Sequence, residues 1–159
     1  MDHIFAPWRM AYIAVSKNQD GCIFCDFPKE QNDEERFILF RGESCFVIFN
    51  IFPYNPGHLM VAPYRHTSEY EGLCDVELLE MHRLAGKCVS VLKKAMNPQG
   101  FNLGVNLGKV AGAGFDDHLH LHIVPRWNGD TNFMPVFSDV RVVAECLADT
   151  YKKMKEAWD

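Results

Sequence analysis

Short apolar runs separated by turn-forming residues are the first pattern along this chain. Each run has the length of a β-strand and is rich in aliphatic, β-branched or aromatic residues, as is typical of strands in a sheet with a buried face. Strands are predicted at Phe37–Phe40, Cys45–Phe49, Leu59–Pro63, Phe101–Asn106 and Asp117–Trp127. Because only four residues, 41–44, separate the first two strands, these are expected to form a hairpin.

Two longer segments carry apolar residues at the i, i+3, i+4, i+7 spacing of an amphipathic helix. They are Asp75–Met96 and Asp139–Trp158. Asp75 is a suitable N-cap for the first helix, and the turn Asn97–Gly100 ends it. The elements predict an α+β fold: one antiparallel sheet of about five strands, one long helix packed on it, and a C-terminal helix.

Length and composition predict one globular domain covering residues 1–159. Of these residues 48% are hydrophobic and 23% are charged, as in a soluble globular protein, and the chain is long enough to bury a hydrophobic core. The formal net charge of -5 argues against duplex nucleic acid as a partner, since binding to it usually needs a basic surface. The chain has no apolar run near the roughly 18 residues of a membrane span and no signal-peptide pattern, so we expect a cytoplasmic protein without a membrane partner. The six cysteines, mostly in apolar segments, are expected to be reduced.

Three histidines alternate with apolar residues in the last predicted strand: His118, His120 and His122. Side chains of a strand alternate between its faces, so the three imidazoles should share one face while their neighbours enter the core. Such a row can supply a nucleophile, a metal ligand and a hydrogen-bond donor to one ligand. A solvent-facing histidine-rich strand or an incidental metal-binding tract is the alternative, which the loop before the strand disfavours.

That loop, Asn106–Phe115, contains three glycines. Glycine lets backbone N–H groups approach a ligand closely, and positive φ angles can turn successive N–H groups toward an anion. Phosphate is the expected ligand. The loop matches neither a Walker motif nor a dinucleotide-binding fingerprint, and glycine-rich turns between strands are common, so alone it is weak evidence.

Cys22 and Cys25 have the spacing that usually supplies one half of a tetrahedral zinc site. A redox pair or an apolar turn would give the same pattern. The other two zinc ligands must come from elsewhere in the chain.

Together these motifs resemble the histidine triad (HIT) superfamily, whose signature alternates histidine with apolar residues. The resemblance covers Cys22–Cys25, Asn50–His66 and Asn106–Trp127. Three segments are similar to the branch of diadenosine tetraphosphate phosphorylases and related hydrolases, namely Ala6–Ile13, Val110–Gly114 and Pro125–Phe133. The resemblance implies a HIT-like fold and a nucleotidyl hydrolase or transferase.

The resemblance also implies roles for individual residues. In the family, the position of His120 forms a covalent nucleotidyl-histidine, and His122 would donate to a phosphate oxygen. His118 would bind zinc or, without metal, donate to the phosphate. Asn50 matches a position that faces the ribose, although the residue type alone equally predicts an Asx-turn. The other predicted nucleotide-binding residues are Asn106, Gly112, Gly114 and Phe115.

Phe115 is a departure from the family pattern. It falls near a position where some relatives have Ser or Thr that assists the leaving group. Asp116 and Asp117 also place two negative charges beside the expected anion site. The leaving-group chemistry is therefore expected to differ here.

The resemblance further implies a metal and an assembly. The zinc ligands would be Cys22, Cys25, His66 and His118. A divalent cation could accompany a polyphosphate substrate. Family members are homodimers, so the strand Phe101–Val105 is expected to pair across a two-fold axis. The aromatic segments Phe5–Ile13 and Trp127–Phe137 would then reach over the neighbouring subunit.

Two classes of function remain open from the sequence. The first is an enzyme acting through nucleotidyl-His120 on a dinucleoside polyphosphate or, as the runner-up, on an adenylyl amidate. The second is a non-catalytic nucleotide- and zinc-binding protein, which the intact triad and its loop disfavour. His58 matches a family position but is as compatible with a buried, hydrogen-bonded histidine. Residues 26–36 read as a surface loop, and His82 as a surface residue.

Overall fold

The computed structural model describes residues 21–130 and 146–158. Its strands are β1 (Ile38–Arg41), β2 (Cys45–Phe49), β3 (Leu59–Pro63), β4 (Gly100–Val105) and β5 (Leu121–Arg126). Its helices are α2 (Ile23–Asp26), η1 (Phe27–Lys29), α3 (Asp33–Arg36), α4 (Asp75–Met96), η2 (Lys109–Ala111) and α6 (Leu147–Trp158). The predicted fold class, an antiparallel sheet with a long helix and a C-terminal helix, is confirmed.

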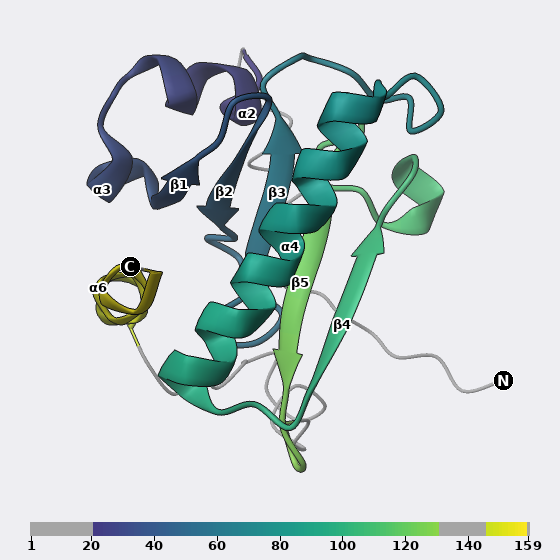
Figure 1. Cartoon of the computed structure of the whole chain (residues 1–159). Coiled ribbons are helices and arrows are strands. Elements are labelled where there is room, and N and C mark those ends of the chain that lie inside the picture. Colours follow the sequence, from purple (N-terminus) through teal and green to yellow (C-terminus); the bar gives the residue numbers. More distant parts are fainter. Residues whose placement is uncertain (1–20, 131–145, 159) are drawn as a thin grey trace, which may run out of the picture.

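The five strands form one sheet in the order β1-β2-β3-β5-β4, and each neighbouring pair is antiparallel. The first three strands follow one another as a meander, and the chain then crosses through α4 to the far edge (Figure 1). The returning strand β5 inserts between β3 and β4, where Met60 and Gly104 both pair with His122. The most chemically distinctive strand is therefore held on both edges.

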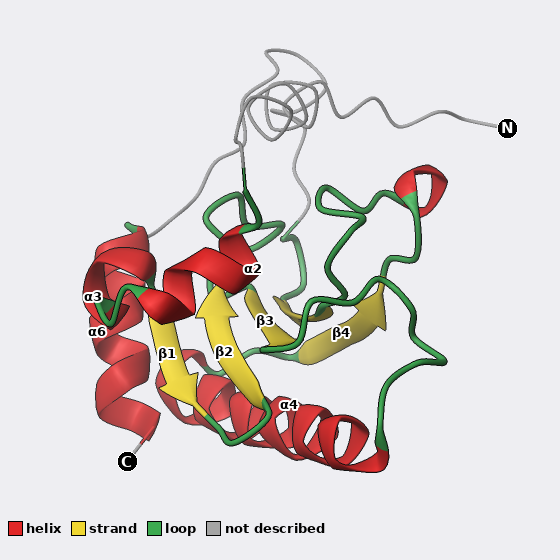
Figure 2. Cartoon of the chain, turned by 90° about the horizontal axis from the view of Figure 1, so that it is seen from above, coloured by secondary structure: helices red, strands yellow, loops and turns green. Residues whose placement is uncertain are grey.

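Helix α4 lies along one face of the sheet, and α6 lies beside β1 (Figures 1 and 2). The buried residues of α4, including Met81, Leu84, Cys88 and Leu92, pack on the strand residues that face this helix. Leu121 and Ile123 of β5 belong to this core, so the alternation of β5 sends its even-numbered residues to the opposite face. Burial of this apolar face fixes the register of β5 with its neighbours, because a slip by one residue would move the apolar residues to the histidine face and the histidines into the core.

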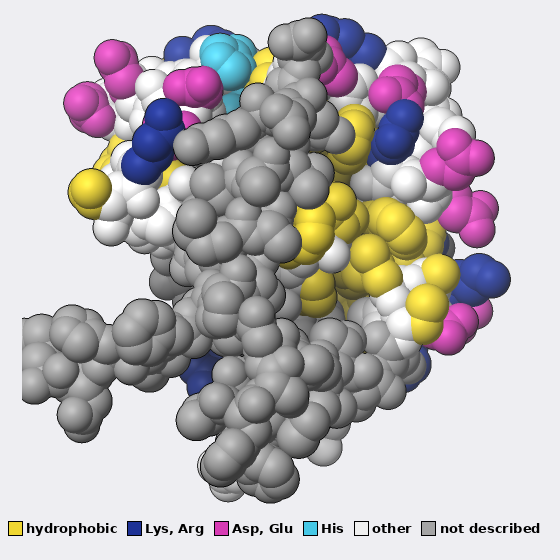
Figure 3. Space-filling view, turned by 180° about the vertical axis from the view of Figure 1, so that it is seen from behind, with side chains coloured by type: hydrophobic (Ala, Val, Ile, Leu, Met, Phe, Trp, Pro, Cys, Tyr) yellow, Lys and Arg dark blue, Asp and Glu magenta, His cyan; other side chains and the backbone are white. Residues whose placement is uncertain are grey.

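The opposite face of the sheet carries a second apolar cluster. Phe24 packs there with Ile38, Phe46, Ile48 and Met60. Figure 3 shows this face with hydrophobic side chains gathered over part of it and a histidine at its upper margin. The sheet thus has one face packed against α4 and a second face on which the histidines lie.

The start of α4 is fastened to the end of β3 by an ion pair. Arg65 donates to both carboxylate oxygens of Glu77 at 2.9 and 2.7 Å, and the backbone N–H of Cys74 also donates to this carboxylate. These hydrogen bonds, that of Arg65 first, lower the pKa of the buried Glu77 to about 2. The N-cap is Cys74, so the prediction of Asp75 was wrong by one residue; Asp75 instead lies in the first turn, where a negative charge is favoured.

Several predicted boundaries differ from the structure. Residues 26–36 are not a plain loop: two short helical turns follow α2, and Arg41 donates to Asp33 and to the carbonyl of Pro28, which holds the segment against β1. Strand β5 begins only at Leu121, because the N–H of Leu119 donates to the carbonyl of Thr67 rather than to a neighbouring strand. The predicted extension of the last helix to 139–145 and the aromatic segments 5–13 and 131–137 lie outside the described residues.

Two expectations from composition can be compared with the described chain. All six cysteines fall within it and none forms a disulfide, as predicted. Among the described helices, none is both long and apolar enough to cross a membrane.

Candidate functional site

The three histidines of the triad lie buried on the sheet face opposite α4. His118, His120 and His122 are each less than 9% exposed. The rings of His120 and His122 meet edge to face, with centroids 4.7 Å apart. The shared face predicted from the alternation is observed, although His118 and His120 precede the first residue of β5.

The tautomer of His120 follows from one hydrogen bond. Its Nδ1 lies 2.8 Å from the carbonyl oxygen of His118, and a carbonyl can only accept, so Nδ1 carries the proton. Burial lowers the pKa of His120, which keeps the ring neutral near pH 7. The lone pair of the neutral ring is therefore on Nε2. An uncharged imidazole with a fixed Nε2 lone pair is a competent nucleophile.

His122 has the opposite tautomer, set by a chain of two hydrogen bonds. The backbone N–H of Tyr54 donates to Nδ1 of His58 at 3.1 Å, so that nitrogen is unprotonated. The remaining proton of a neutral His58 is on Nε2, which lies 2.9 Å from Nδ1 of His122. His58 thus donates to Nδ1 of His122, which leaves the proton of His122 on Nε2. A donor nitrogen therefore stands next to the nucleophilic nitrogen.

His58 is wholly buried, so the reading of a buried, hydrogen-bonded histidine is correct. It was not among the predicted site residues, but strand parity could have included it. His58 precedes Met60 by two residues, and Met60 pairs with His122, so both side chains share the triad face. His82 is exposed on α4, as predicted.

A cluster of four side chains lies beside the first histidine. The ligand atoms of Cys22, Cys25, His66 and His118 are all within 4.8 Å of one another. Nδ1 of His118 lies 3.3 Å from Sγ of Cys22 and 3.3 Å from Nδ1 of His66. Nε2 of His118 donates to the carbonyl of Pro63 at 2.9 Å, so its lone pair is on Nδ1 and faces the thiols.

The donor set of this cluster fits a zinc ion. Two thiols and two imidazoles are a usual tetrahedral set, and the carbonyl behind His118 is the partner that orients a metal-binding imidazole. Burial and the Cys22 thiol raise the pKa of Cys25 to about 11, so a cation has to displace that proton on binding. The structure brings together all four residues that the resemblance implied as zinc ligands.

Phe24 separates the metal cluster from the rest of the face. Its ring stacks on His120 with centroids 4.7 Å apart and also contacts His118 at 5.2 Å. The ring of Phe115 meets Phe24 edge-on at 5.9 Å. Phe24 was not predicted as a site residue; a lone aromatic between two cysteines gives no signal of this contact.

The glycine-rich loop has only part of its expected form. Gly108 and Gly112 have positive φ angles of 77° and 90°, as an anion nest requires. However, the N–H groups of Ala111, Gly112 and Ala113 donate to carbonyls of Gly108 and Lys109. Two of the backbone donors expected for phosphate, the N–H groups of Gly112 and Ala113, are therefore used inside the loop in this conformation.

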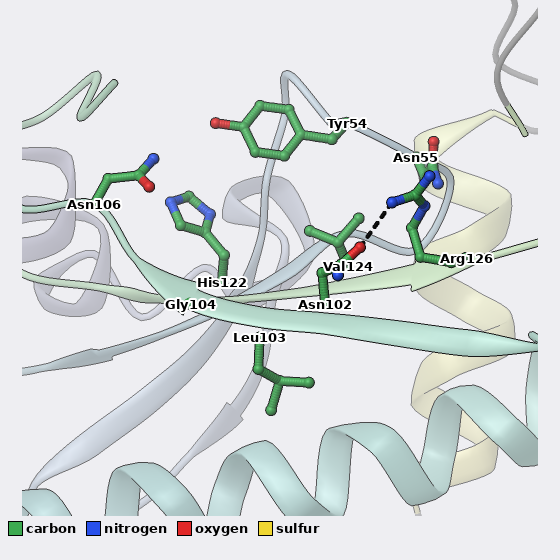
Figure 4. Close-up of a pocket in the computed structure, with 9 residues that line it drawn as sticks. All are labelled: Tyr54, Asn55, Asn102, Leu103, Gly104, Asn106, His122, Val124 and Arg126. Carbon is green, nitrogen blue, oxygen red and sulfur yellow. Dashed lines mark hydrogen bonds between the residues drawn. The ribbon is translucent and has the colours of Figure 1, made fainter. Parts of the chain in front are cut away.

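Asn50 adopts the Asx-turn that was the alternative for it. Its Oδ1 accepts the N–H of Phe52 at 2.9 Å, and its amide nitrogen lies 3.5 Å from Nδ1 of His58. Asn106, by contrast, lies close to His122 (Figure 4). The structure thus brings Asn106 to the triad, whereas Asn50 supports its own turn and the ring of His58.

A cavity of about 350 Å³ opens beside His122, over strands β4 and β5. Its walls include Tyr54, Asn55, Asn102 and Arg126 (Figure 4). Arg126 donates to Asn102 at 2.7 Å and pairs with Asp130 at 2.6 Å. Hydrogen bonds from Arg126 first, then from the backbone N–H of Trp127 and from Asn55, hold the pKa of Asp130 well below its usual range, which keeps the pair charged. No motif in the sequence indicated this cavity, because its residues alternate with core positions on two strands.

Known proteins share this fold and its histidine motif. The family model for the HIT domain matches residues 31–129. The chain belongs to the histidine triad (HIT) family.

Relatives within the family include nucleotide-processing enzymes. An AP-4-A phosphorylase of Mycobacterium tuberculosis is 38% identical, over 99% of this chain and 85% of its own length. An adenosine 5'-monophosphoramidase of Schizosaccharomyces pombe is 31% identical, over 68% of this chain and 76% of its own. The family and the enzyme class that the sequence indicated are therefore confirmed.

Among solved structures, a zinc-bound histidine triad family protein from Mycobacterium smegmatis has the same fold. Its TM-score is 0.69 at 22% identity, over 90% of this chain and 94% of that one.

We predict that the proton of His122 is on Nε2 and that His58 holds it there. Nitrogen-15 spectra of the labelled protein should show a protonated Nε2 and an unprotonated Nδ1 for His122. His58→Asn, which is too short to reach His122, should mix the two tautomers, whereas His82→Gln on the exposed face of α4 should leave the His122 signals unchanged. A wild-type protein with the His122 proton on Nδ1 would contradict the assignment.

Proposed function

We propose that this chain is a diadenosine tetraphosphate phosphorylase or hydrolase that acts through a covalent nucleotidyl-His120 intermediate. The observation that carries the proposal is the fixed tautomer of His120: a buried, neutral ring whose Nδ1–H is held by a backbone carbonyl. The 38% identity to an AP-4-A phosphorylase over nearly the whole chain supports the substrate class.

In the first step, Nε2 of His120 attacks the α-phosphorus, and an N–P bond forms. The bond from this phosphorus to the bridging oxygen breaks, and the electron pair leaves with the departing nucleoside polyphosphate. In the second step an oxygen of phosphate or water attacks the same phosphorus and the N–P bond breaks. Phosphate would yield a nucleoside diphosphate, and water a monophosphate.

The surrounding groups would absorb the charge that develops on the phosphoryl oxygens. His122 would donate from Nε2, and the amide of Asn106 stands near it. Gly112, Gly114 and Phe115 would contribute backbone contacts, that of Gly112 only after its N–H releases the carbonyl of Lys109. Asn50 would meet the ribose in the same conditional way, since its oxygen serves the turn.

His118 serves this chemistry best through its backbone. Its two ring nitrogens face the carbonyl of Pro63 and the thiols, so a direct donation to phosphate is the less favoured of its two roles. Its carbonyl holds His120 in the reactive tautomer. A divalent cation accompanying the polyphosphate remains part of the proposal, as does a cytoplasmic location, with which the free thiols agree.

A phosphoramidase is the second candidate function. The same nucleophile and donor would cleave an adenylyl amidate, and a relative named as a monophosphoramidase is 31% identical. A non-catalytic binding protein is less favoured, because nothing in a binding role requires the opposite tautomers of His120 and His122.

His120→Asn should abolish turnover of diadenosine tetraphosphate while nucleotide binding persists, because the pocket is built from other residues. Chromatography of products with and without inorganic phosphate would measure turnover and identify the acceptor. His122→Asn should keep measurable activity, falling by on the order of 10²–10³, since it removes one donor and not the attacking atom. Unchanged turnover in zinc-replete His120→Asn would remove His120 from this role.

Zinc is the second part of the proposal, with Cys22, Cys25, His66 and His118 as its ligands. Elemental analysis should find about one zinc per chain. Removing both thiols in Cys22→Ser/Cys25→Ser should eliminate the metal and lower the melting temperature, because metal binding contributes to folding free energy. Cys146→Ser, at an exposed thiol, serves as the control. Carefully prepared wild-type protein without metal would refute the site.

A homodimer is the third part. Strand β4 is an edge of the sheet with Leu103 about half exposed, and Val76 and Leu79 are exposed on α4. Such an unprotected edge is a pairing surface unless a second chain covers it. Light scattering should give twice the 18.2 kDa of the chain. Leu103→Lys should shift the equilibrium toward monomer, whereas a monomeric wild type would end this part of the proposal.

A further inference from the structure

Strand β4 has a glycine in its interior at position 104, directly opposite His122. Glycine in a strand costs stability and usually marks a bulge or a close approach by a ligand or another chain. The register of β4 with β5 is regular through this position, and Gly104 is not among the described glycines with positive φ. Backbone conformation therefore does not require glycine here.

Packing inside the chain does not require it either. A Cβ placed on Gly104 would meet no described heavy atom within 4 Å. The space above Gly104 belongs to the cavity beside His122. What the glycine preserves is thus the volume of that cavity, at the side where the histidines lie.

The cavity has apolar walls, and several of the polar groups set among them donate hydrogen bonds. Oδ1 of Asn102 accepts a hydrogen bond from Arg126, so the Asn102 side chain has its amide N–H groups to donate to another acceptor. Asn106 offers an amide, whose nitrogen also lies 3.4 Å from the carbonyl oxygen of Gly112, and His122 offers an Nε2–H (Figure 4). The guanidinium of Arg126 donates to Asp130 and Asn102, and its remaining N–H groups are the ones it adds to the lining. Such a lining suits a ligand rich in acceptor oxygens, and phosphate oxygens are the acceptors that Arg and amide groups bind well.

The position of the cavity relates it to the reaction. It begins at His122 and Asn106, beside the proposed nucleophile, and extends past Val124 to Arg126. Alternate residues of a strand are roughly 6.5–7 Å apart, so the cavity leads away from His120 along the strand, on the side opposite the metal cluster. Phe24 fills the other side of His120, so this cavity is the open volume available to a chain that departs from a phosphoryl group on His120.

We propose that this cavity is the leaving-group subsite, that it holds the polyphosphate of the departing nucleotide, and that Gly104 is its specificity-determining residue. The inference rests on the proposed function and deepens it. A substrate that releases ammonia needs no room over Gly104, whereas one that releases a nucleoside triphosphate does. Gly104 would therefore favour dinucleoside polyphosphates over adenylyl amidates.

Gly104→Val tests the inference, because its side chain would stand on the cavity floor while a β-branched residue suits the strand. For diadenosine tetraphosphate, kcat/KM should fall by roughly tenfold to a hundredfold, and for adenosine 5'-phosphoramidate it should change less than about twofold. Gly104→Ala should give an intermediate loss. Gly100→Val is the matched control: it is on the same strand face, its added Cβ also meets nothing, and it does not line the cavity.

Binding of inorganic tripolyphosphate by calorimetry tests the subsite without turnover. Gly104→Val should bind it roughly tenfold or more weakly than the wild type or the Gly100→Val control. A wild type inert toward both substrates would refute the proposed function and still leave this measurement decisive for the cavity.

Three outcomes would overturn the inference. The first is equal loss for both substrates, which would indicate a general effect on the site. The second is unchanged tripolyphosphate binding by Gly104→Val. The third is a Gly104→Val protein whose dimer dissociates more readily while its preference between the two substrates is unchanged. That result would mean that Gly104 serves contact with a second chain.

Discussion

The hydrogen bond between Nδ1 of His120 and the carbonyl of His118 is the constraint on which the candidate site depends. It is possible because β5 begins at Leu121, so the carbonyl of His118 lies outside the paired part of the strand. In a continued ladder that carbonyl would face a neighbouring strand. The irregular entry to β5 is therefore what allows a side chain to be oriented by its own backbone, two residues away.

The same principle sets the three imidazoles into three different environments. His118 is oriented by the carbonyl of Pro63, His120 by the carbonyl of His118, and His122 by the ring of His58. In His118 and His120 a carbonyl accepts from the protonated nitrogen directly. In His122 the tautomer is set indirectly, because the N–H of Tyr54 donates to Nδ1 of His58 and so leaves Nε2 of His58 to donate to His122. The three imidazoles therefore differ in what they present. His118 directs a lone pair at the thiols, His120 has a lone pair on Nε2 for nucleophilic attack, and His122 has a proton on Nε2 to donate.

Patterns along the chain were enough to predict the sheet, α4 and the shared face of the histidines, because burial on one face imposes a period on the sequence. They could not predict the entry to β5, where the N–H of Leu119 donates to the carbonyl of Thr67, since that bond depends on a residue 52 positions earlier. Asn50 shows the same limit in reverse. Its residue type allowed a turn or a ligand contact, and only the position of Phe52 and His58 decides that the turn is formed.

The two sides of the histidine row are built in opposite ways, and this asymmetry bears on specificity. Phe24 stacks on His120 toward the metal cluster, and this side is filled by an aromatic ring that a ligand cannot displace without exposing apolar surface. On the other side Gly104 and His122 border open volume. Because a filled core tolerates little change in volume whereas a cavity accepts ligands of different size, differences among HIT proteins in the group they release should be sought at the β4 side.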